Sequence, residues 1–147
     1  MPPRIRHFLH DSVQTGSQAL GTAFNTSDVH THNMLDGFPD SWKDRNYQGI
    51  VEGIHVRLTN ASAPSATKIT IRICADANGD DVLVPDTEAE LVAGVTTTTT
   101  QCAAFSVKLP LFQILSAPGN GNLYLFAKVD DATVAPAFAQ SSITWRE

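Results

Sequence analysis

The sequence predicts an all-β sandwich, and it favours a jelly roll over an immunoglobulin topology. Apolar and polar residues alternate along several segments after Gly49, and turns rich in Gly, Pro, Asn and Asp separate these segments. The sequence contains no amphipathic pattern long enough for a helix of three turns. The Cys, Trp and Cys spacing of immunoglobulin domains is also absent, so a jelly roll whose last strand bears a large aromatic residue fits better.

Each strand is expected where apolar side chains recur at every second position, because this places them on one face of an extended chain. Pro64 lies in the turn after the first such strand, and Pro110 ends a later one. Thr96 to Thr100 favour extended backbone because threonine is β-branched. Asp76 to Asp86 form a turn-rich loop that includes a short strand, Val82 to Val84. The expected apolar faces are, in chain order, Ile54, Val56 and Leu58; Ile69, Ile71 and Ile73; Phe105, Val107 and Leu109; Leu123, Leu125, Ala127 and Val129; and Ile143 with Trp145.

Residues 1–48 differ from the rest of the chain. They are rich in Ser, Thr, Asn, Asp, His and Gly and show no sustained periodicity. We therefore expect an extended N-terminal arm over residues 1–48 and a β-sandwich domain over residues 49–147. Isolated apolar residues in the arm are expected to anchor it on its own domain or on neighbouring subunits. The anchors expected to bind a partner are Phe8, Leu9, Phe24, Met34, Leu35, Phe38 and Trp42.

Composition excludes several classes of protein. A chain of 147 residues with 42% hydrophobic and 17% charged residues suits one domain with one core. The 15 acidic residues outnumber the 10 basic ones, whereas a nucleic-acid binder needs the opposite excess. No apolar run could span a bilayer, and the first twelve residues carry charges where a signal peptide needs an apolar stretch. We expect a soluble, non-secreted protein without a nucleic-acid or membrane partner.

The two cysteines, Cys74 and Cys102, are too few for a disulfide scaffold or a cysteine-rich zinc site. Free, buried thiols are the favoured interpretation. One bridge between neighbouring strands is the alternative, because spacing alone does not show whether the geometry of a disulfide can be met.

Asp76, Asn78 and Asp80 place oxygen-bearing side chains at alternate positions, as at the start of a calcium loop. The EF-hand pattern fails, because the glycine falls at the fourth position instead of the sixth and Thr87 occupies the twelfth position. Side-chain oxygens that accept hydrogen bonds from backbone amides in a tight turn explain the same residues. We therefore expect no metal and no cofactor.

His30 and His32 flank one residue, so on an extended strand both imidazoles point the same way, as metal ligands sometimes do. Two ligands do not make a site, and spacing does not identify His7, His10 or His55 as a third. Surface histidines in a polar arm are the favoured interpretation. A metal on a symmetry axis, with one histidine from each subunit, stays open.

The sequence does not predict an enzyme. It lacks a serine elbow and a defined cysteine–histidine setting, and the glycines around Gly119 lack the lysine and helix of a phosphate loop. Adjacent carboxylates such as those of Asp130 and Asp131 fall in expected turns, where they are solvated. Four aromatic residues could form a sugar-stacking platform. Core packing is favoured for Tyr124 and Trp145, and contacts of the arm or of a second subunit for Trp42 and Tyr47.

Two segments resemble virion structural proteins of tailed phages. They are Ile69 to Asp76, followed by Gly79-Asp80-Asp81, and Leu123 to Asp130, which leads to Ile143-Thr144-Trp145. The similarity extends over about residues 49–147 and is to small jelly-roll decoration (cement) proteins and to β-sandwich head and fibre modules. It transfers no functional residue by position.

The resemblance implies a capsid decoration protein on the virion surface, made in the host cytoplasm. It implies binding across seams of the major capsid protein, with self-association as a homotrimer. Deleting residues 1–40 is then expected to leave a folded sandwich that no longer binds the capsid. The alternative is a carbohydrate- or receptor-binding β-sandwich module of a tail or host-attachment apparatus, which predicts an exposed aromatic cluster and affinity for a glycan.

Overall fold

A computed structural model describes residues 7–13, 19–26, 29–33, 49–63, 67–91, 95–110, 113, 121–131 and 136–146. For residues 7–13, 60–63, 90–91, 95–100 and 146 it describes the backbone alone. No helix within these ranges has the length and apolar character needed to cross a membrane. The described residues form eight strands: β1 (His7–Val13), β2 (His30–Asn33), β3 (Ile50–Ala63), β4 (Thr67–Cys74), β5 (Val82–Leu91), β6 (Val95–Pro110), β7 (Asn122–Val129) and β8 (Ala137–Arg146).

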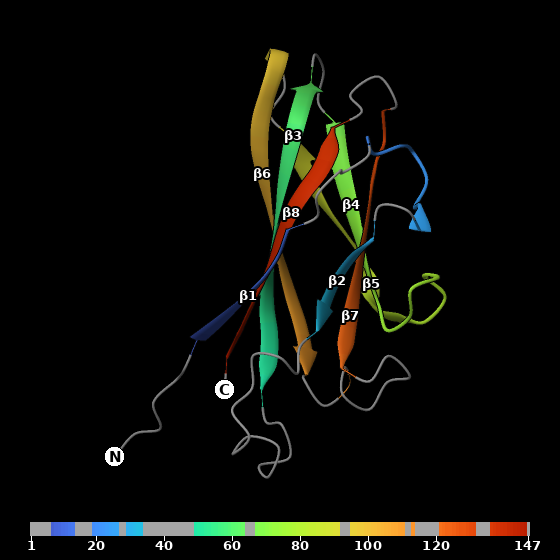
Figure 1. The fold of residues 1–147 in the computed structure, drawn as a ribbon, viewed down its shortest axis with the longest axis vertical. Coiled ribbons are helices and arrows are strands. Elements are labelled where there is room, and N and C mark those ends of the chain that lie inside the picture. Colours follow the sequence, from blue (N-terminus) through green and yellow to red (C-terminus); the bar gives the residue numbers. More distant parts are fainter. Residues whose placement is uncertain are drawn as a thin grey trace.

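The strands form four nested antiparallel pairs, in which β1 pairs with β8, β2 with β7, β3 with β6 and β4 with β5. Additional pairing of β8 with β3 and of β7 with β4 joins them into two four-stranded sheets. Sheet A has the order β1-β8-β3-β6, and sheet B has the order β2-β7-β4-β5 (Figure 1). The first strand pairs with the last, and each following strand pairs with the next one inward from the other end. This nested pairing is the topology of a jelly roll. The predicted fold class is therefore confirmed.

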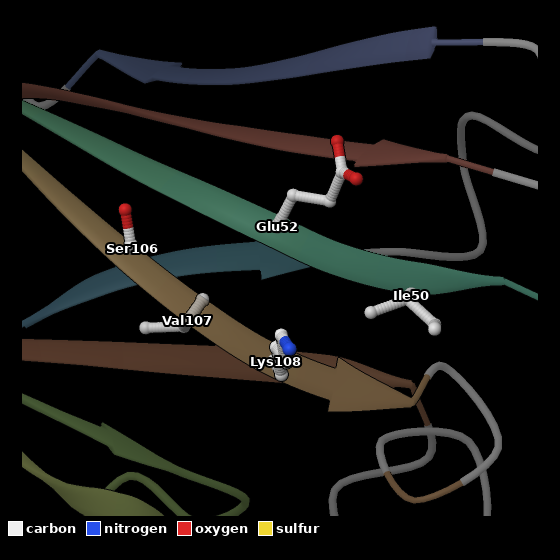
Figure 2. Close-up of a pocket in the computed structure, with 5 residues that line it drawn as sticks. All are labelled: Ile50, Glu52, Ser106, Val107 and Lys108. Carbon is white, nitrogen blue, oxygen red and sulfur yellow. The ribbon is translucent and has the colours of Figure 1, made fainter.

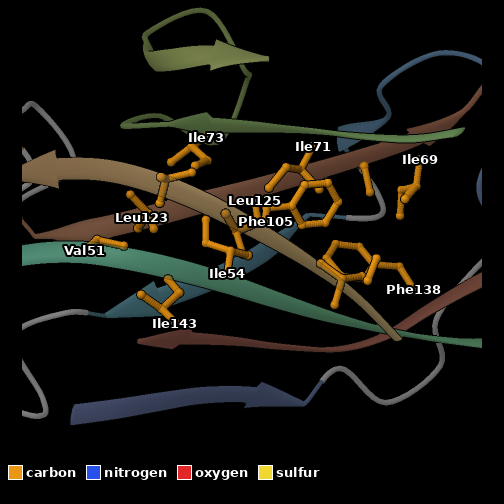
Figure 3. Close-up of a cluster of buried hydrophobic side chains, with 14 of the residues drawn as sticks. Val51, Ile54, Ile69, Ile71, Ile73, Phe105, Leu123, Leu125, Phe138 and Ile143 are labelled. Carbon is orange, nitrogen blue, oxygen red and sulfur yellow. The ribbon is translucent and has the colours of Figure 1, made fainter. Parts of the chain in front are cut away.

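The hydrophobic core lies between the two sheets. Figure 3 shows side chains such as Ile54 and Phe105 of sheet A facing Ile71 and Leu125 of sheet B. Every apolar face predicted from alternation is buried, with each of its side chains at most 9% exposed. Because burying one such side chain contributes about 1.5–3 kcal/mol, these faces are the main source of the stability that holds the sheets together.

Two strands are longer than expected. β3 continues to Ala63, where the sequence suggested a turn from Asn60, and β5 extends well beyond Val84. Pro85 is tolerated within β5 because this strand is an edge of sheet B and its register with β4 shifts at this point. The Thr96–Thr100 run lies in β6, as predicted.

The described parts of residues 1–48 pack on the sandwich of their own chain. β1 is an edge strand of sheet A, and β2 is an edge strand of sheet B. Between them, the Leu20 amide donates to the Pro136 carbonyl at 2.7 Å, and the Gly21 carbonyl accepts from the Val129 amide at 3.0 Å. Leu20 is only 2% exposed. The sandwich therefore extends into the segment expected to be an arm, while the boundary between residues 48 and 49 stays a prediction.

Candidate functional site

The outer face of sheet A is an open polar surface. Alternation along β3, β6 and β8 turns small, polar and charged residues away from the core. The exposed residues of this face are His55, Arg57, Cys102, Ala104, Ser106 and Lys108, and half-buried Glu52, Gln140, Ser142 and Thr144 lie beside them.

A hollow of about 550 Å³ lies on this face, over β3 and β6 (Figure 2). Its volume is within the usual range of small-molecule sites. Glu52 supplies a carboxylate, Ser106 a hydroxyl and Lys108 an ammonium group, with Ile50 and Val107 as apolar lining. These groups can accept hydrogen bonds from a bound molecule and donate hydrogen bonds to it.

A close approach between β3 and β8 lies beside this hollow. The register of β3 shifts between Val51 and Gly53 against both neighbouring strands, which takes Glu52 out of the regular pairing. A Cβ atom on Gly53 would lie 2.8 Å from the Thr144 Oγ1 atom. The Thr144 hydroxyl also donates to the Gly53 carbonyl at 3.3 Å. A side chain at position 53 would therefore displace the Thr144 hydroxyl from its bond to the Gly53 carbonyl.

A smaller hollow of about 180 Å³ on the same face is lined by His55, Val56, Arg57, Cys102, Gln140 and Ser142. Cys102 is an exposed free thiol, and Cys74 is a buried free thiol. Burial raises the pKa of Cys74 to about 11. The prediction of free cysteines is confirmed, but the prediction of burial is wrong for Cys102, because it lies at an outward position of β6.

The outer face of sheet B, in contrast, is covered by the protein's own chain. Phe126 points away from the core cluster, yet it is only 2% exposed because the loop at Gly79 lies over its ring. Half-buried Phe24 packs on the same sheet, with the Arg72 guanidinium 4.4 Å and the Lys128 ammonium 4.8 Å from its ring centroid. These are cation–π contacts.

The candidate calcium ligands form a hydrogen-bonded turn. The Asp76 carboxylate accepts from the amides of Asp81 at 2.8 Å and of Asn78 and Asp80 at 3.3 Å each. These bonds, that from the Asp81 amide above all, lower the pKa of Asp76. The interpretation of this segment as an amide-capping turn is confirmed. Across the described residues, no group of three or more His, Cys, Asp or Glu side chains could hold a metal ion.

His30 and His32 are not surface residues, so that interpretation is wrong. They are 1% and 0% exposed, and both contact Ser141 of β8, which is 0% exposed. The Ser141 Oγ atom lies 2.8 Å from His30 Nδ1 and 2.7 Å from His32 Nε2. The predicted same-side orientation is confirmed, but it directs the rings into the sandwich. The sequence offers no apolar signal there, and the two-residue spacing was the only indication.

The environment of His30 keeps its imidazole neutral. His30 Nε2 lies 3.1 Å from the Phe138 carbonyl, and the two rings stack at 3.6 Å with an angle of 2°. Burial lowers the pKa of His30 to about 4, although the bond to the Phe138 carbonyl acts in the opposite direction. A serine hydroxyl between imidazoles is a nucleophile arrangement in hydrolases. Here complete burial keeps substrate from reaching the hydroxyl, so the cluster is structural.

The structure describes only part of the expected partner-binding set. Phe24 contacts its own sheet B, as described above. Phe8 and Leu9 lie in β1, where their backbones pair with Trp145 and Thr144, and their side chains lie outside the described residues. The remaining residues of the set, Met34, Leu35, Phe38 and Trp42, also lie outside them. Their partner-binding role stays a prediction.

No protein-family model matches the chain, and no curated protein matches it either. Solved structures show a distant similarity. An exo-β-1,3-galactanase from Phanerochaete chrysosporium is 10% identical with a TM-score of 0.46, over 96% of this chain and 29% of that chain. A chain of the T13 IBDV viral particle is 14% identical with a TM-score of 0.43, over 98% of this chain and 31% of that chain. A carbohydrate-binding module of Cel9A from Ruminococcus flavefaciens FD-1 is 10% identical with a TM-score of 0.46, over 94% of this chain and 98% of that chain.

The chain thus spans under a third of the galactanase and viral chains. Similarities at these scores do not support an argument about function. The strand pairing defines the class by itself: the protein is a β-sandwich of the jelly-roll type, an architecture that occurs in both structural and binding modules.

Proposed function

We propose that the protein is a virion structural protein, a decoration (cement) protein that stabilises a tailed-phage head by binding across seams of the major capsid protein. The nested eight-stranded jelly roll is the observation that supports this most, because this architecture recurs in viral capsid domains. The step from fold to role is an analogy. It therefore needs a docking surface that can be tested residue by residue.

The outer face of sheet A is the proposed docking surface. Exposed Arg57 and Lys108 give it positive charges in a chain whose formal net charge is −5. The outer face of sheet B is less available, because Phe24 and the loop at Gly79 already lie on it. An acidic surface on the capsid protein would complement the outer face of sheet A and fix its orientation.

The N-terminal segment and self-association complete the proposal. A homotrimer on a three-fold axis would engage several seams at once, so that many weak contacts add up. β1 is the edge of sheet A, beside the proposed docking surface, and Phe8 and Leu9 within it belong to the proposed anchors. This role requires neither catalysis nor a nucleic-acid or membrane partner.

Co-sedimentation with purified heads that lack the protein tests the proposal. The wild type should bind to saturation and should run as a trimer in native mass spectrometry. Arg57→Glu with Lys108→Glu should weaken binding at least about tenfold, as expected for losing two charge pairs. Lys68→Glu is the matched control on sheet B and should bind like the wild type. A wild type that stays in the supernatant contradicts the function, and unweakened binding by the double variant contradicts the docking surface.

Deleting residues 1–40 is not a suitable test. That deletion removes β1, β2 and buried Leu20, and it leaves Ser141 without both histidine partners. The expectation of a folded sandwich after this deletion is therefore abandoned. Loss of capsid binding would follow from damage to the fold whatever the role of the N-terminal segment.

The hollow beside Glu52 favours a second candidate, a carbohydrate- or receptor-binding module. Its volume of about 550 Å³ and its mixed donors and acceptors suit a sugar. A sugar-binding platform also needs an exposed aromatic ring. Among the described side chains, Phe126 and Trp145 are each 2% exposed and Tyr124 is half-buried. A glycan array distinguishes the two candidates. Hits that disappear with Glu52→Gln or Lys108→Ala support this function, and an array without hits contradicts it.

A further inference from the structure

The two buried histidines and Ser141 form a directional chain of hydrogen bonds. The Phe138 carbonyl can only accept, so His30 Nε2 donates to it and His30 Nδ1 has the lone pair. The Ser141 hydroxyl therefore donates to His30 Nδ1, and its oxygen accepts from His32 Nε2. With His30 neutral and His32 protonated on Nε2, every proton in this chain has an acceptor.

This chain of hydrogen bonds connects β2 to β8 of sheet A. β2 has four residues, it is the edge of sheet B, and β7 is its one partner within that sheet. Its two inward positions are both histidine, whereas β4 on the other side of β7 inserts Ile69, Ile71 and Ile73 into the core. The described contacts of these two inward side chains with sheet A are thus hydrogen bonds to Ser141 and to the Phe138 carbonyl and the stacking of His30 on the Phe138 ring.

A proton added to His30 Nδ1 reverses its bond with Ser141. The Ser141 oxygen would then accept from His30 Nδ1, and the Ser141 proton would keep an acceptor only if His32 moved its ring proton from Nε2 to Nδ1. Among the described side chains, the added charge would lie against neutral Phe138 and Ser141, and the residue that pairs with His30 in β7 is Leu125. Burying a charge without an opposite charge costs free energy. Protonation of His30 therefore shifts the equilibrium toward an open state of β2 in which water hydrates the imidazolium.

Other titratable groups near β2 are few among the described side chains. His32 lies on the same face. Tyr124 and Lys128 of β7 alternate with the inward residues and lie on the outer face of sheet B. β1 also contacts β2 and contains His7, His10 and Asp11, and β8 ends at Arg146; the side chains of these four residues lie outside the described part.

We propose that the His30–Ser141–His32 cluster is an acid-sensitive lock, and that proton uptake by His30 releases β2 from the sandwich while the rest of the jelly roll stays folded. The lock does not depend on the capsid role. It provides a device by which mild acid detaches one edge of the sandwich and the chain segment that leads to it.

The expected size follows from linkage. The pKa of His30 is about 4 in the closed state and 6.5 in a hydrated open state. The open state therefore binds the proton more tightly, and the equilibrium constant for opening rises as the pH falls from about 6.5 to about 4. Between pH 7 and pH 5 the expected rise is on the order of 20-fold. Above pH 7 opening should not depend on this group.

Hydrogen exchange with mass spectrometry at pH 7 and pH 5, corrected for intrinsic rates, tests the proposal on the full chain. The amides of β2 should exchange about 20-fold faster at pH 5. The amides of Ile69–Cys74 in β4 are the internal control and should change less than about twofold. A rise shared by β2 and β4 would indicate global unfolding and would overturn the proposal, as would an unchanged β2.

Two variants and one titration complete the test. His30→Asn keeps an acceptor and a donor but cannot be protonated, and it should abolish the acid response of β2. His32→Gln keeps a donor to Ser141, and it should retain the response. If His30→Asn does not fold, NMR titration of the wild-type histidine carbons is sufficient. A His30 resonance that titrates near pH 4 in the folded protein supports the lock, and one that titrates near 6.5 overturns it.

Discussion

The outer faces of the two sheets differ in how far their outward side chains are covered, although the strands of both sheets share one alternating pattern. On sheet B, outward Phe126 is 2% exposed because the loop at Gly79 covers it. On sheet A, outward Cys102, Ser106 and Lys108 are exposed. Aromatic residues at outward positions therefore mark the face that the chain covers itself, and small or charged residues mark the face that it leaves open. The comparison separates residues that hold the fold from residues available for contact.

Truncation of Phe126 is expected to cause the largest loss in the free energy of unfolding. Phe126→Ala removes a fully covered ring and should lower the free energy of unfolding by about 3–5 kcal/mol. Cys102→Ser alters an equally outward but exposed position on sheet A and should change it by less than about 0.5 kcal/mol. Urea denaturation measures both values. Equal losses for the two variants would contradict the difference between the faces.

A substitution in the loop that covers sheet B is expected to cause the next largest loss of stability. Gly79 has a φ of +81°, and a Cβ atom there would lie 3.4 Å from the Phe126 ring. Gly79→Ala should therefore cost about 1–3 kcal/mol, because residues with a side chain disfavour this backbone conformation. Gly21→Ala is the matched control, since a Cβ atom on Gly21 meets nothing within 4 Å. Thermal denaturation should show a lower Tm for the first variant and little change for the second.

Much of this fold was predictable from sequence, because long apolar alternation identifies a strand without any knowledge of its partners. The inward sets of β3, β4, β6, β7 and β8 follow directly from that pattern. β1 and β2 were not predicted as strands, since they lie in a segment without apolar periodicity. In β2 the inward positions are His30 and His32, whose polarity suggests a surface location. Hydrogen bonds to Ser141 and to the Phe138 carbonyl, which lie more than a hundred residues away in the sequence, offset part of the cost of burying these imidazoles.

The open face was predictable only in part. His55, Arg57, Ser106 and Lys108 alternate with the predicted apolar faces of β3 and β6, and the structure shows all four exposed. The hollow beside Glu52 was not expected, because it arises from a register shift at Gly53 that depends on the approach of Thr144 from a distant strand. Pairing irregularities of this kind are set by tertiary contacts and leave little trace in local sequence.

Removing an ion pair on sheet B should lower the free energy of unfolding by a smaller amount, which depends on the geometry of the pair. Arg72 binds Asp86 through two hydrogen bonds of 2.9 Å each, and it also lies over the Phe24 ring. Arg72→Ala should cost about 1 kcal/mol. The pair of Lys68 and Glu88 is single and more exposed, at 3.4 Å, so Lys68→Ala should cost less than about 0.5 kcal/mol. Equal urea midpoints for the two variants would contradict this ranking.

The same ion pair predicts the acid side of the stability curve. Hydrogen bonding to Arg72 lowers the pKa of Asp86 below its usual 3.8. The pair therefore stabilises the fold fully above that unfolded value, and this contribution is lost as the pH falls through the lower folded value. The Asp86 transition thus lies below the range in which the buried histidine acts. In Asp86→Asn, stability should lose its Asp86-dependent decrease below pH 4 and keep the decrease between pH 6.5 and pH 4.

Chelation of calcium should have the smallest effect. The Asp76 carboxylate already accepts three backbone amides, so a calcium ion would have to displace hydrogen bonds that shape the turn over Phe126. Excess EDTA should leave the Tm of the purified protein unchanged, and added millimolar calcium should not raise it, because a ligand stabilises only the state that binds it. Asp76→Ala should lower the Tm to the same extent with or without calcium. A calcium-dependent rise in Tm that Asp76→Ala abolishes would show that this turn opens to bind the ion, and the covered face of sheet B would then be regulated by calcium.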